Sequence, residues 1–316
     1  MHRVTAFVQG TGLRLSIVIL LGMLLLGAPA GMAAEQIRVM GSSSDMIAIA
    51  QEIAKDRMTG YSPFAGYQEP ELFIEEVFPS WAMRAARADL YIRIGLFADI
   101  WASTLLVDSR NHRILPGEAG YVDASEGVQV LEVPTWKIDR SRGEIHIQGN
   151  PHYLLNPLNA KIVADNILRG LIRVSPENAD FFRKNAADFK ARIDRAMKRW
   201  QQQAQPLRGK KLAAYHKTWS YLAHTFGFEV VGYCEPRPGI EPSPRELRDL
   251  IETMKREKAS LVIYAPVYSP RIPEFVAGQV GGKAVKLPAH VGGAPEAKDY
   301  FGLFDYLIGT LVREIQ

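Results

Sequence analysis

The chain alternates short apolar segments with amphipathic stretches, and this alternation most constrains its fold. In the first half, Ile37–Met40, Leu90–Ile94 and Val128–Val133 have the length and composition of strands. Helical spacing follows each of them, for example at Phe97–Leu106. A second alternating series begins at Leu212. Strands that alternate with helices predict parallel sheets whose strands are joined by right-handed crossovers.

One long amphipathic segment, Glu177–Gln205, separates the two series. Pro176 suits the first position of a helix, apolar residues recur every three or four positions as far as Trp200, and Pro206 ends the pattern. At 1.5 Å per residue the helix would span roughly 40 Å. A coiled-coil arm and a spine crossing two lobes both fit that length. We predict an α/β fold with two lobes, each a mostly parallel sheet flanked by helices, joined by one long spine helix.

The N-terminus has the pattern of a secretory signal peptide. Arg3 and Arg14 precede the apolar run Leu15–Leu26, and small residues follow, with cleavage expected after Ala33 or Ala34. The run is short for a membrane anchor, which is the less favoured alternative. No cysteine lies nearby to carry a lipid. The predicted parts are 1–34 signal peptide, 35–174 N-terminal lobe, 175–206 linking helix and 207–316 C-terminal lobe.

Charge and cysteine content restrict the possible partners. The formal net charge of +4 falls to +2 once Arg3 and Arg14 are removed with the signal, which is too mild to indicate a nucleic-acid partner. The single cysteine, Cys234, can form no internal disulfide and is expected to be a small core residue. We expect a monomer whose spine allows only small lobe movements.

Two histidines occupy matching places in the two series. His216 ends the apolar run Lys211–Tyr215, and His152 lies in a proline-bounded loop that leads into a helix. Ligands of open α/β sheets bind at the carboxyl ends of strands, and imidazole is the commonest ligand for transition metals. The pair therefore predicts a metal held between the lobes. His112 is expected to be solvated, His224 to be packed or solvated, and His146 to be a surface histidine, although His146 could deliver a metal or hold it transiently.

The segments around these histidines resemble the zinc- and manganese-binding solute receptors of bacterial ABC importers, the cluster A-I family. Residues 150–157, NPHYLLNP, are similar to the family segment Asp/Asn-Pro-His-aromatic-x-Asp-Pro, with Asn156 where Asp is common. Tyr215-His216 with Phe226–Glu229, and residues 235–244, also resemble family segments, and the likeness runs from about Ile37 to Ile315. The resemblance implies periplasmic capture of zinc or manganese and delivery to an ABC permease in the inner membrane.

The chain departs from that family at two implied ligands. The family's first ligand is a histidine, and here Glu71 takes its place, with Glu69 as a second candidate. A carboxylate can bind zinc and suits manganese. The family's last ligand is usually a carboxylate, but the corresponding region is acid-free and offers His290, whereas Asp299 is expected to cap the final helix. The resemblance thus gives His152, His216, Glu71 and His290 as the expected ligands.

Two other classes of function stay open at this stage. A site with only three protein ligands would leave a position for water, as in a zinc hydrolase. The sequence has no His-Glu-x-x-His pair and no Gly-x-Ser-x-Gly elbow to support an enzyme. Because the first histidine is missing, a receptor that has lost its metal and binds another ligand or partner is the third class.

Overall fold

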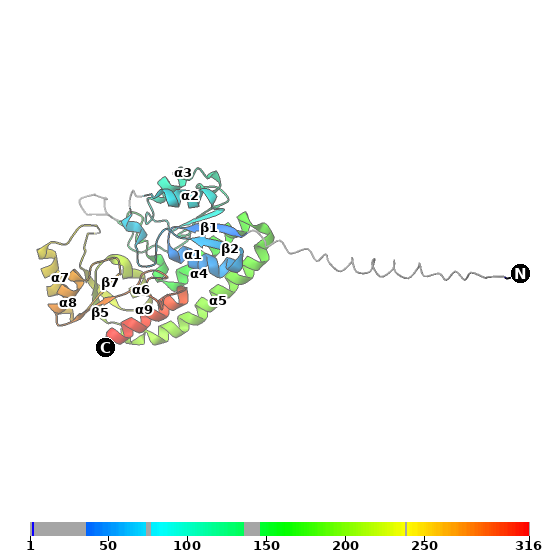
Figure 1. The fold of residues 1–316 in the computed structure, drawn as a ribbon. Helices are drawn as coiled ribbons and strands as arrows, with labels where there is room; N and C mark the ends of the chain where they lie inside the picture. Colours follow the sequence, from blue (N-terminus) through cyan, green and yellow to red (C-terminus); the bar gives the residue numbers. More distant parts are fainter. Residues whose placement is uncertain (1, 3–35, 74–76, 136–145, 238, 316) are drawn as a thin grey trace. The chain divides into compact units, whose positions relative to one another are not determined.

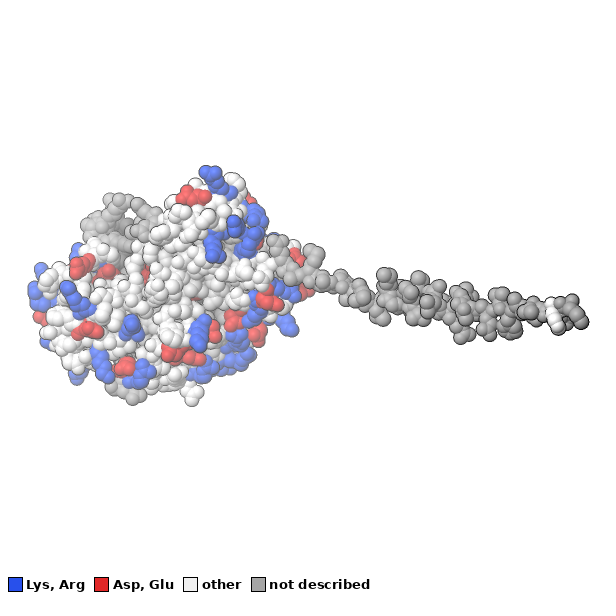
Figure 2. All heavy atoms as spheres, in the orientation of Figure 1, with Lys and Arg blue, Asp and Glu red and all other residues white. Residues whose placement is uncertain are grey.

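The computed structural model describes residues 2, 36–73, 77–135, 146–237 and 239–315 (Figure 1). From Gln36 onward the chain forms one compact unit. Apart from residue 2, the predicted signal peptide lies outside the described residues. Within the described ranges no helix is long and apolar enough to cross a membrane. Lys and Arg side chains are interspersed with Asp and Glu over the face seen in Figure 2.

The N-terminal lobe is built on a four-stranded parallel sheet in the order β2-β1-β3-β4. Its two central strands, β1 and β3, are mostly buried, as expected for a parallel sheet covered by helices, while the edge strands β2 and β4 are more exposed. The strands are β1 (Ile37–Gly41), β2 (Met58–Tyr61), β3 (Leu90–Arg93) and β4 (Tyr121–Asp123), and the helices are α1 (Ser44–Ala54), α2 (Pro79–Arg87), α3 (Ala102–Asp108) and α4 (Pro157–Val174).

The C-terminal lobe repeats this topology. Its parallel sheet has the order β6-β5-β7-β8, so in both lobes the first strand lies between the second and the third. The connections on the two sides of this first strand run in opposite directions. Open α/β sheets bind ligands at the carboxyl ends of the strands at such a position. The strands are β5 (Lys211–Ala214), β6 (Glu229–Tyr233), β7 (Leu261–Tyr264) and β8 (Lys283–Lys286), and the helices are α6 (Ser220–Phe226), α7 (Pro244–Glu257), α8 (Arg271–Gly278) and α9 (Tyr300–Glu314).

The long helix α5 (Ala179–Gln203) runs along both lobes, which confirms the predicted spine (Figure 1). Near its start it packs on α1 and α4, and near its end it packs on α9. The Trp200 ring lies 5.1 Å from the ring of Phe304, and its Nε1 donates to Asp305 Oδ1 at 2.6 Å. The fold class predicted from the sequence is confirmed.

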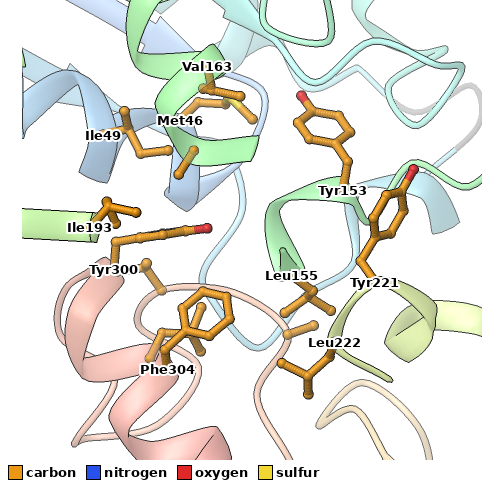
Figure 3. Packing of buried hydrophobic residues seen from close by; sticks show 14 of the residues in the cluster. Met46, Ile49, Tyr153, Leu155, Val163, Ile193, Tyr221, Leu222, Tyr300 and Phe304 are labelled. Atoms are coloured by element: carbon orange, nitrogen blue, oxygen red, sulfur yellow. The ribbon is translucent and has the colours of Figure 1, made fainter. Parts of the chain in front are cut away.

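A single hydrophobic core joins the lobes. Figure 3 shows Met46 of α1, Ile193 of α5, Phe304 of α9 and Leu222 of α6 in one buried cluster. Because this core crosses the lobe boundary, separating the lobes would expose apolar side chains to water. The expectation of small lobe movements stays a prediction, and so do the domain boundaries.

Two sequence predictions of local structure were wrong. Val128–Val133 is not a strand. Its backbone groups form hydrogen bonds with residues at the junction of the lobes and not with a neighbouring strand. Leu131 N donates to the Tyr221 hydroxyl at 2.9 Å, and Asn150 N donates to Leu131 O at 2.8 Å. The helix expected at Phe97–Leu106 begins only at Ala102. Residues 95–97 all have positive φ, which a right-handed helix does not allow.

The expectations for Cys234 and Asp299 are confirmed. Cys234 is fully buried, and burial raises the pKa of its thiol to about 12. Asp299 caps α9, since its carboxylate accepts from Gly302 N at 2.8 Å.

The start of α7 carries a capping box. The Ser243 hydroxyl accepts from Glu246 N at 3.3 Å, and Ser243 N donates back to the Glu246 carboxylate at 2.7 Å. We expect Ser243→Ala to lower the free energy of unfolding by about 1 kcal/mol because it removes the cap. Urea denaturation measures this. Glu252→Ala, on the exposed face of the same helix, is the control and should stay within about 0.5 kcal/mol of the parent protein.

Candidate metal centre

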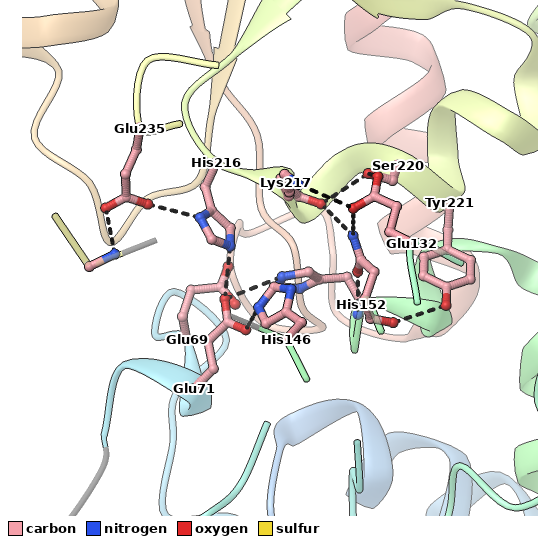
Figure 4. Close-up of polar contacts among 12 residues, drawn as sticks. Glu69, Glu71, Glu132, His146, His152, His216, Lys217, Ser220, Tyr221 and Glu235 are labelled. Carbon is pink, nitrogen blue, oxygen red and sulfur yellow. Dashed lines mark hydrogen bonds and ion pairs between the residues drawn. The ribbon is translucent and has the colours of Figure 1, made fainter. Parts of the chain in front are cut away.

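Four side chains from separate parts of the chain meet where the lobes face each other. Glu71, His146, His152 and His216 each offer one ligand atom, and these atoms lie within 4.8 Å of one another (Figure 4). Among the residues that the structure describes, this is the group with the composition and spacing of a metal site.

The local fold presents each of these side chains to the centre. Glu71 lies in the 3-10 turn Pro70–Leu72, and His216 lies two residues after the end of β5, at the carboxyl end of its sheet. His152 precedes a 3-10 turn and is fixed by its neighbour Asn150, whose Oδ1 accepts from His152 N at 2.9 Å. The Asn150 amide also donates to Lys217 O at 2.8 Å. The two histidine segments are therefore tied together across the lobes.

The three imidazoles form a nearly equilateral triangle. Their ring centroids are 5.7 Å apart for His146 and His152, 5.6 Å for His146 and His216, and 5.7 Å for His152 and His216. The rings stand at 73° to 82° to one another, so they do not stack. Three imidazoles and one carboxylate whose ligand atoms lie this close together form a set of four ligands of the types that bind zinc.

Three buried polar atoms at this point have no hydrogen-bond partner among the described residues: Glu71 Oε1, His152 Nε2 and His216 Nε2. Glu71 Oε1 lies 3.2 Å from the His152 nitrogen and 3.3 Å from the His216 nitrogen. In the part of the chain that the structure describes, these atoms contact only one another, as ion pairs that lack good hydrogen-bond geometry, so their burial is poorly compensated in the metal-free protein. A divalent cation would satisfy all three, so the donor set fits a metal.

A further carboxylate orients His216. Its Nδ1 lies 2.8 Å from Glu235 Oε2, and a carboxylate only accepts, so Nδ1 carries the proton and Nε2 is left for the centre. Glu235 is 7% exposed, and its other oxygen accepts from Gly239 N at 3.2 Å. The sequence reasoning did not single out Glu235. The available signal was its place just after β6, which neighbours β5.

The carboxylates and imidazoles of the centre shift one another's pKa values. Burial by itself raises the pKa of Glu71, but the charges of His152 and His146 outweigh it and hold that pKa well below its usual range. Burial lowers the pKa of His216, yet the hydrogen bond to Glu235 and the charge of Glu71 outweigh it and raise the pKa to about 10. At neutral pH the metal-free centre therefore holds a proton on His216, where a metal would bind.

Metal binding should consequently release a proton. Because His216 must lose its proton to bind a metal, the affinity for zinc should rise with pH between about 6 and 9, by up to tenfold per unit for one proton. Calorimetry in two buffers of different ionisation enthalpy counts the protons. Glu235→Gln should reduce the count, since it weakens the bond that raises the pKa. An affinity independent of pH over this range would contradict the assignment.

The structure places the other candidate residues as follows. His146 is not the surface histidine that was expected, because its side chain is 14% exposed and its Nε2 bonds Glu71 Oε2 at 2.9 Å. His290 is not brought to the four side chains: its ring nitrogens are held by Asp45 and Glu69. Glu69 is thereby engaged as well. Burial lowers the pKa of His290, but the two carboxylates outweigh it and raise the pKa well above its usual value. His224 is exposed on α6.

Comparisons with known proteins lead to transport proteins. The chain is 23% identical over 215 residues to "High-affinity zinc uptake system protein ZnuA" of Bacillus subtilis (strain 168), covering 67% of this chain and 66% of that protein, slightly less than two thirds of its length. It is 24% identical over 253 residues to "Manganese ABC transporter substrate-binding lipoprotein PsaA" of Streptococcus pneumoniae, covering 78% of each.

Solved structures share the fold. A crystal structure of ZnuA superposes with a TM-score of 0.75 and 22% identity, covering 89% of this chain and all of that chain. The family described as "Zinc-uptake complex component A periplasmic" matches residues 39–314, and by this match over most of its length the chain belongs to that family.

Proposed function

We propose that the protein captures a divalent transition metal between its lobes, with Glu71, His146, His152 and His216 as ligands. The observation that carries the proposal is the convergence of three buried, unpartnered atoms, one each from Glu71, His152 and His216. His146 supplies the third imidazole, and its Nε2 now bonds the second oxygen of Glu71. The metal is cargo in this proposal and not a resident cofactor.

The donor set favours zinc over manganese as the cargo. Three imidazole nitrogens and one carboxylate form a tetrahedral site of the kind that zinc prefers, whereas manganese prefers more oxygen ligands. The names of the relatives include both metals, zinc for the Bacillus protein and manganese for the Streptococcus protein. We therefore expect tighter binding of zinc, with manganese as the weaker alternative.

The wider role follows from the family. We propose that the N-terminal segment directs export to the periplasm and that the monomeric protein delivers its metal to an ABC permease. Four protein ligands would fill a tetrahedral zinc shell and leave no position for a reacting water, which speaks against the hydrolase reading. The complete donor set likewise speaks against a receptor that has lost its metal.

Metal analysis of protein purified without chelator tests the proposal. We expect about one zinc per chain, lost on dialysis against a chelator and regained on adding zinc. His152→Ala and His216→Ala should each prevent stable retention, while His224→Ala should retain the metal. A parent protein that carries no metal and binds neither zinc nor manganese at micromolar concentration would overturn the proposed function.

A further inference from the structure

A second histidine–carboxylate cluster, made of Asp45, Glu69 and His290, lies beside the proposed metal ligands and joins the lobes. His290 Nδ1 contacts Asp45 Oδ2, and His290 Nε2 lies 2.9 Å from Glu69 Oε2. Asp45 belongs to α1 and Glu69 precedes the turn Pro70–Leu72, so both are in the N-terminal lobe, while His290 follows β8. Asp45 and Glu69 are each 2% exposed. One C-terminal imidazole thus bridges two buried N-terminal carboxylates.

The backbone around His290 is fixed on the N-terminal lobe. Val291 N donates to Asp45 Oδ1 at 2.8 Å, and Ser44 Oγ donates to Val291 O at 2.8 Å. Gly66 lies so close that a Cβ there would be 2.1 Å from Val291 O. A side chain at Gly66 would force these segments apart. The ring of His290 is therefore held in place independently of the metal ligands.

Glu69 connects this cluster to the metal centre. It is two residues before Glu71, and the intervening 3-10 turn is closed by Leu72 N donating to Glu69 O at 3.2 Å. A cavity of about 30 Å³, room for one water molecule, is lined by Glu71, His152 and His290 among others. The Glu71 carboxylate adjoins this space and otherwise contacts His146, His152 and His216, so the turn that follows Glu69 sets the point from which the carboxylate reaches them.

We propose that His290 is a positioning residue, which holds Glu69 and thereby sets Glu71 at the distance from His216 that metal binding needs. The inference rests on the proposed function, since it assigns Glu71 as a ligand. The contacts of His290 cross the same boundary between the lobes as the proposed ligands do. Among those ligands, His216 belongs to the C-terminal lobe and Glu71 to the N-terminal lobe. Groups that orient metal ligands typically contribute 10- to 100-fold to affinity.

A double-mutant cycle tests whether His290 acts through Glu71. The zinc dissociation constant is measured by chelator competition for the parent, His290→Gln, Glu71→Ala and the double variant. We expect His290→Gln to weaken binding about tenfold in the parent background. In the Glu71→Ala background the same change should weaken binding less than about twofold, because the carboxylate that it positions is gone.

A spectroscopic signature and a stability control separate positioning from general loosening. With Co²⁺ in place of zinc, the visible band of His290→Gln should shift towards that of Glu71→Ala. The Glu71 carboxylate is displaced from the metal in the first variant and absent in the second. Ser243→Ala loses a helix cap that contacts neither the ligands nor this cluster, and it should leave the dissociation constant and the band unchanged. If His290→Gln does not fold, Glu69→Ala replaces it in the cycle, since it removes the partner of Nε2 and leaves the contact of Nδ1 with Asp45.

Each outcome decides between the two proposals. If Glu71→Ala weakens binding while His290→Gln does not, or if the two effects simply multiply, His290 is not a positioning residue and the proposed function stands. If the parent protein binds neither zinc nor Co²⁺, the proposed function fails and this inference falls with it. Less-than-multiplicative loss together with the shifted Co²⁺ band supports the inference.

Discussion

His216→Ala should weaken zinc binding by on the order of 100- to 1,000-fold. Structural zinc sites bind with apparent free energies of about 10–16 kcal/mol at neutral pH, shared among four ligands, and each 1.4 kcal/mol is a factor of ten. The lost imidazole is 2% exposed and points its unpartnered Nε2 at Glu71. Its removal leaves the centre one ligand short. Chelator-competition titration measures the change.

The matched control is His224→Ala, since His224 lies on the neighbouring helix α6 with an exposed side chain. It should bind zinc as tightly as the parent. Circular dichroism must first show that His216→Ala is folded, because the substitution also leaves Glu235 without its partner. A folded His216→Ala protein with parent-like affinity would remove His216 from the ligand set.

Zinc should raise the midpoint of thermal unfolding by on the order of 10 °C. A ligand that binds only the folded state at a thousand times its dissociation constant adds about 4 kcal/mol. In a protein of this size, each kcal/mol corresponds to roughly 2–4 °C. The physical reason is local: the metal provides the partner that Glu71 Oε1, His152 Nε2 and His216 Nε2 lack. Scanning calorimetry with and without zinc measures the shift.

The shift should depend on the site and on the cation. The double variant His152→Ala with His216→Ala should show almost none of it. Magnesium, which prefers oxygen ligands and holds its waters, should give little stabilisation of the parent. A shift below about 1 °C at saturating zinc, or an equal shift in the double variant, would contradict the assignment of the centre.

Most of the fold could be predicted because its signals are local. Strands such as Leu261–Tyr264 are short apolar runs between turn residues, and α5 shows three-and-four spacing with a proline at each end. The failures occurred where tertiary contacts decide. Val128–Val133 has the composition of a strand, but Tyr221 and Asn150 take its backbone groups. Residues after β3 look helical, but the buried carboxylate of Asp99 accepts from Ile94 N at 2.8 Å and fixes a left-handed turn between them.

The residues of the candidate site also divide into those that the sequence could predict and those that it could not. His152 and His216 stand beside predictable elements, so their meeting follows from topology, and Glu71 lies in a proline turn of recognisable sequence. His146 follows a polar segment with no period, and nothing local marks it as part of the centre. His290 looked like a ligand because of its position. In the structure its ring nitrogens contact Asp45 and Glu69, which are 245 and 221 residues away in sequence, a pairing that no local pattern encodes.

The burial of Cys234 makes the protein well suited to site-specific labelling. Its thiol has no exposed surface and a raised pKa, so reagents that attack thiolates at neutral pH should leave it unmodified. Cysteines introduced at Val107 on α3 and Phe275 on α8, which are 71% and 51% exposed, would then be the reactive pair, one on each lobe. A donor and an acceptor dye at these positions would follow the distance between the lobes while zinc binds and leaves.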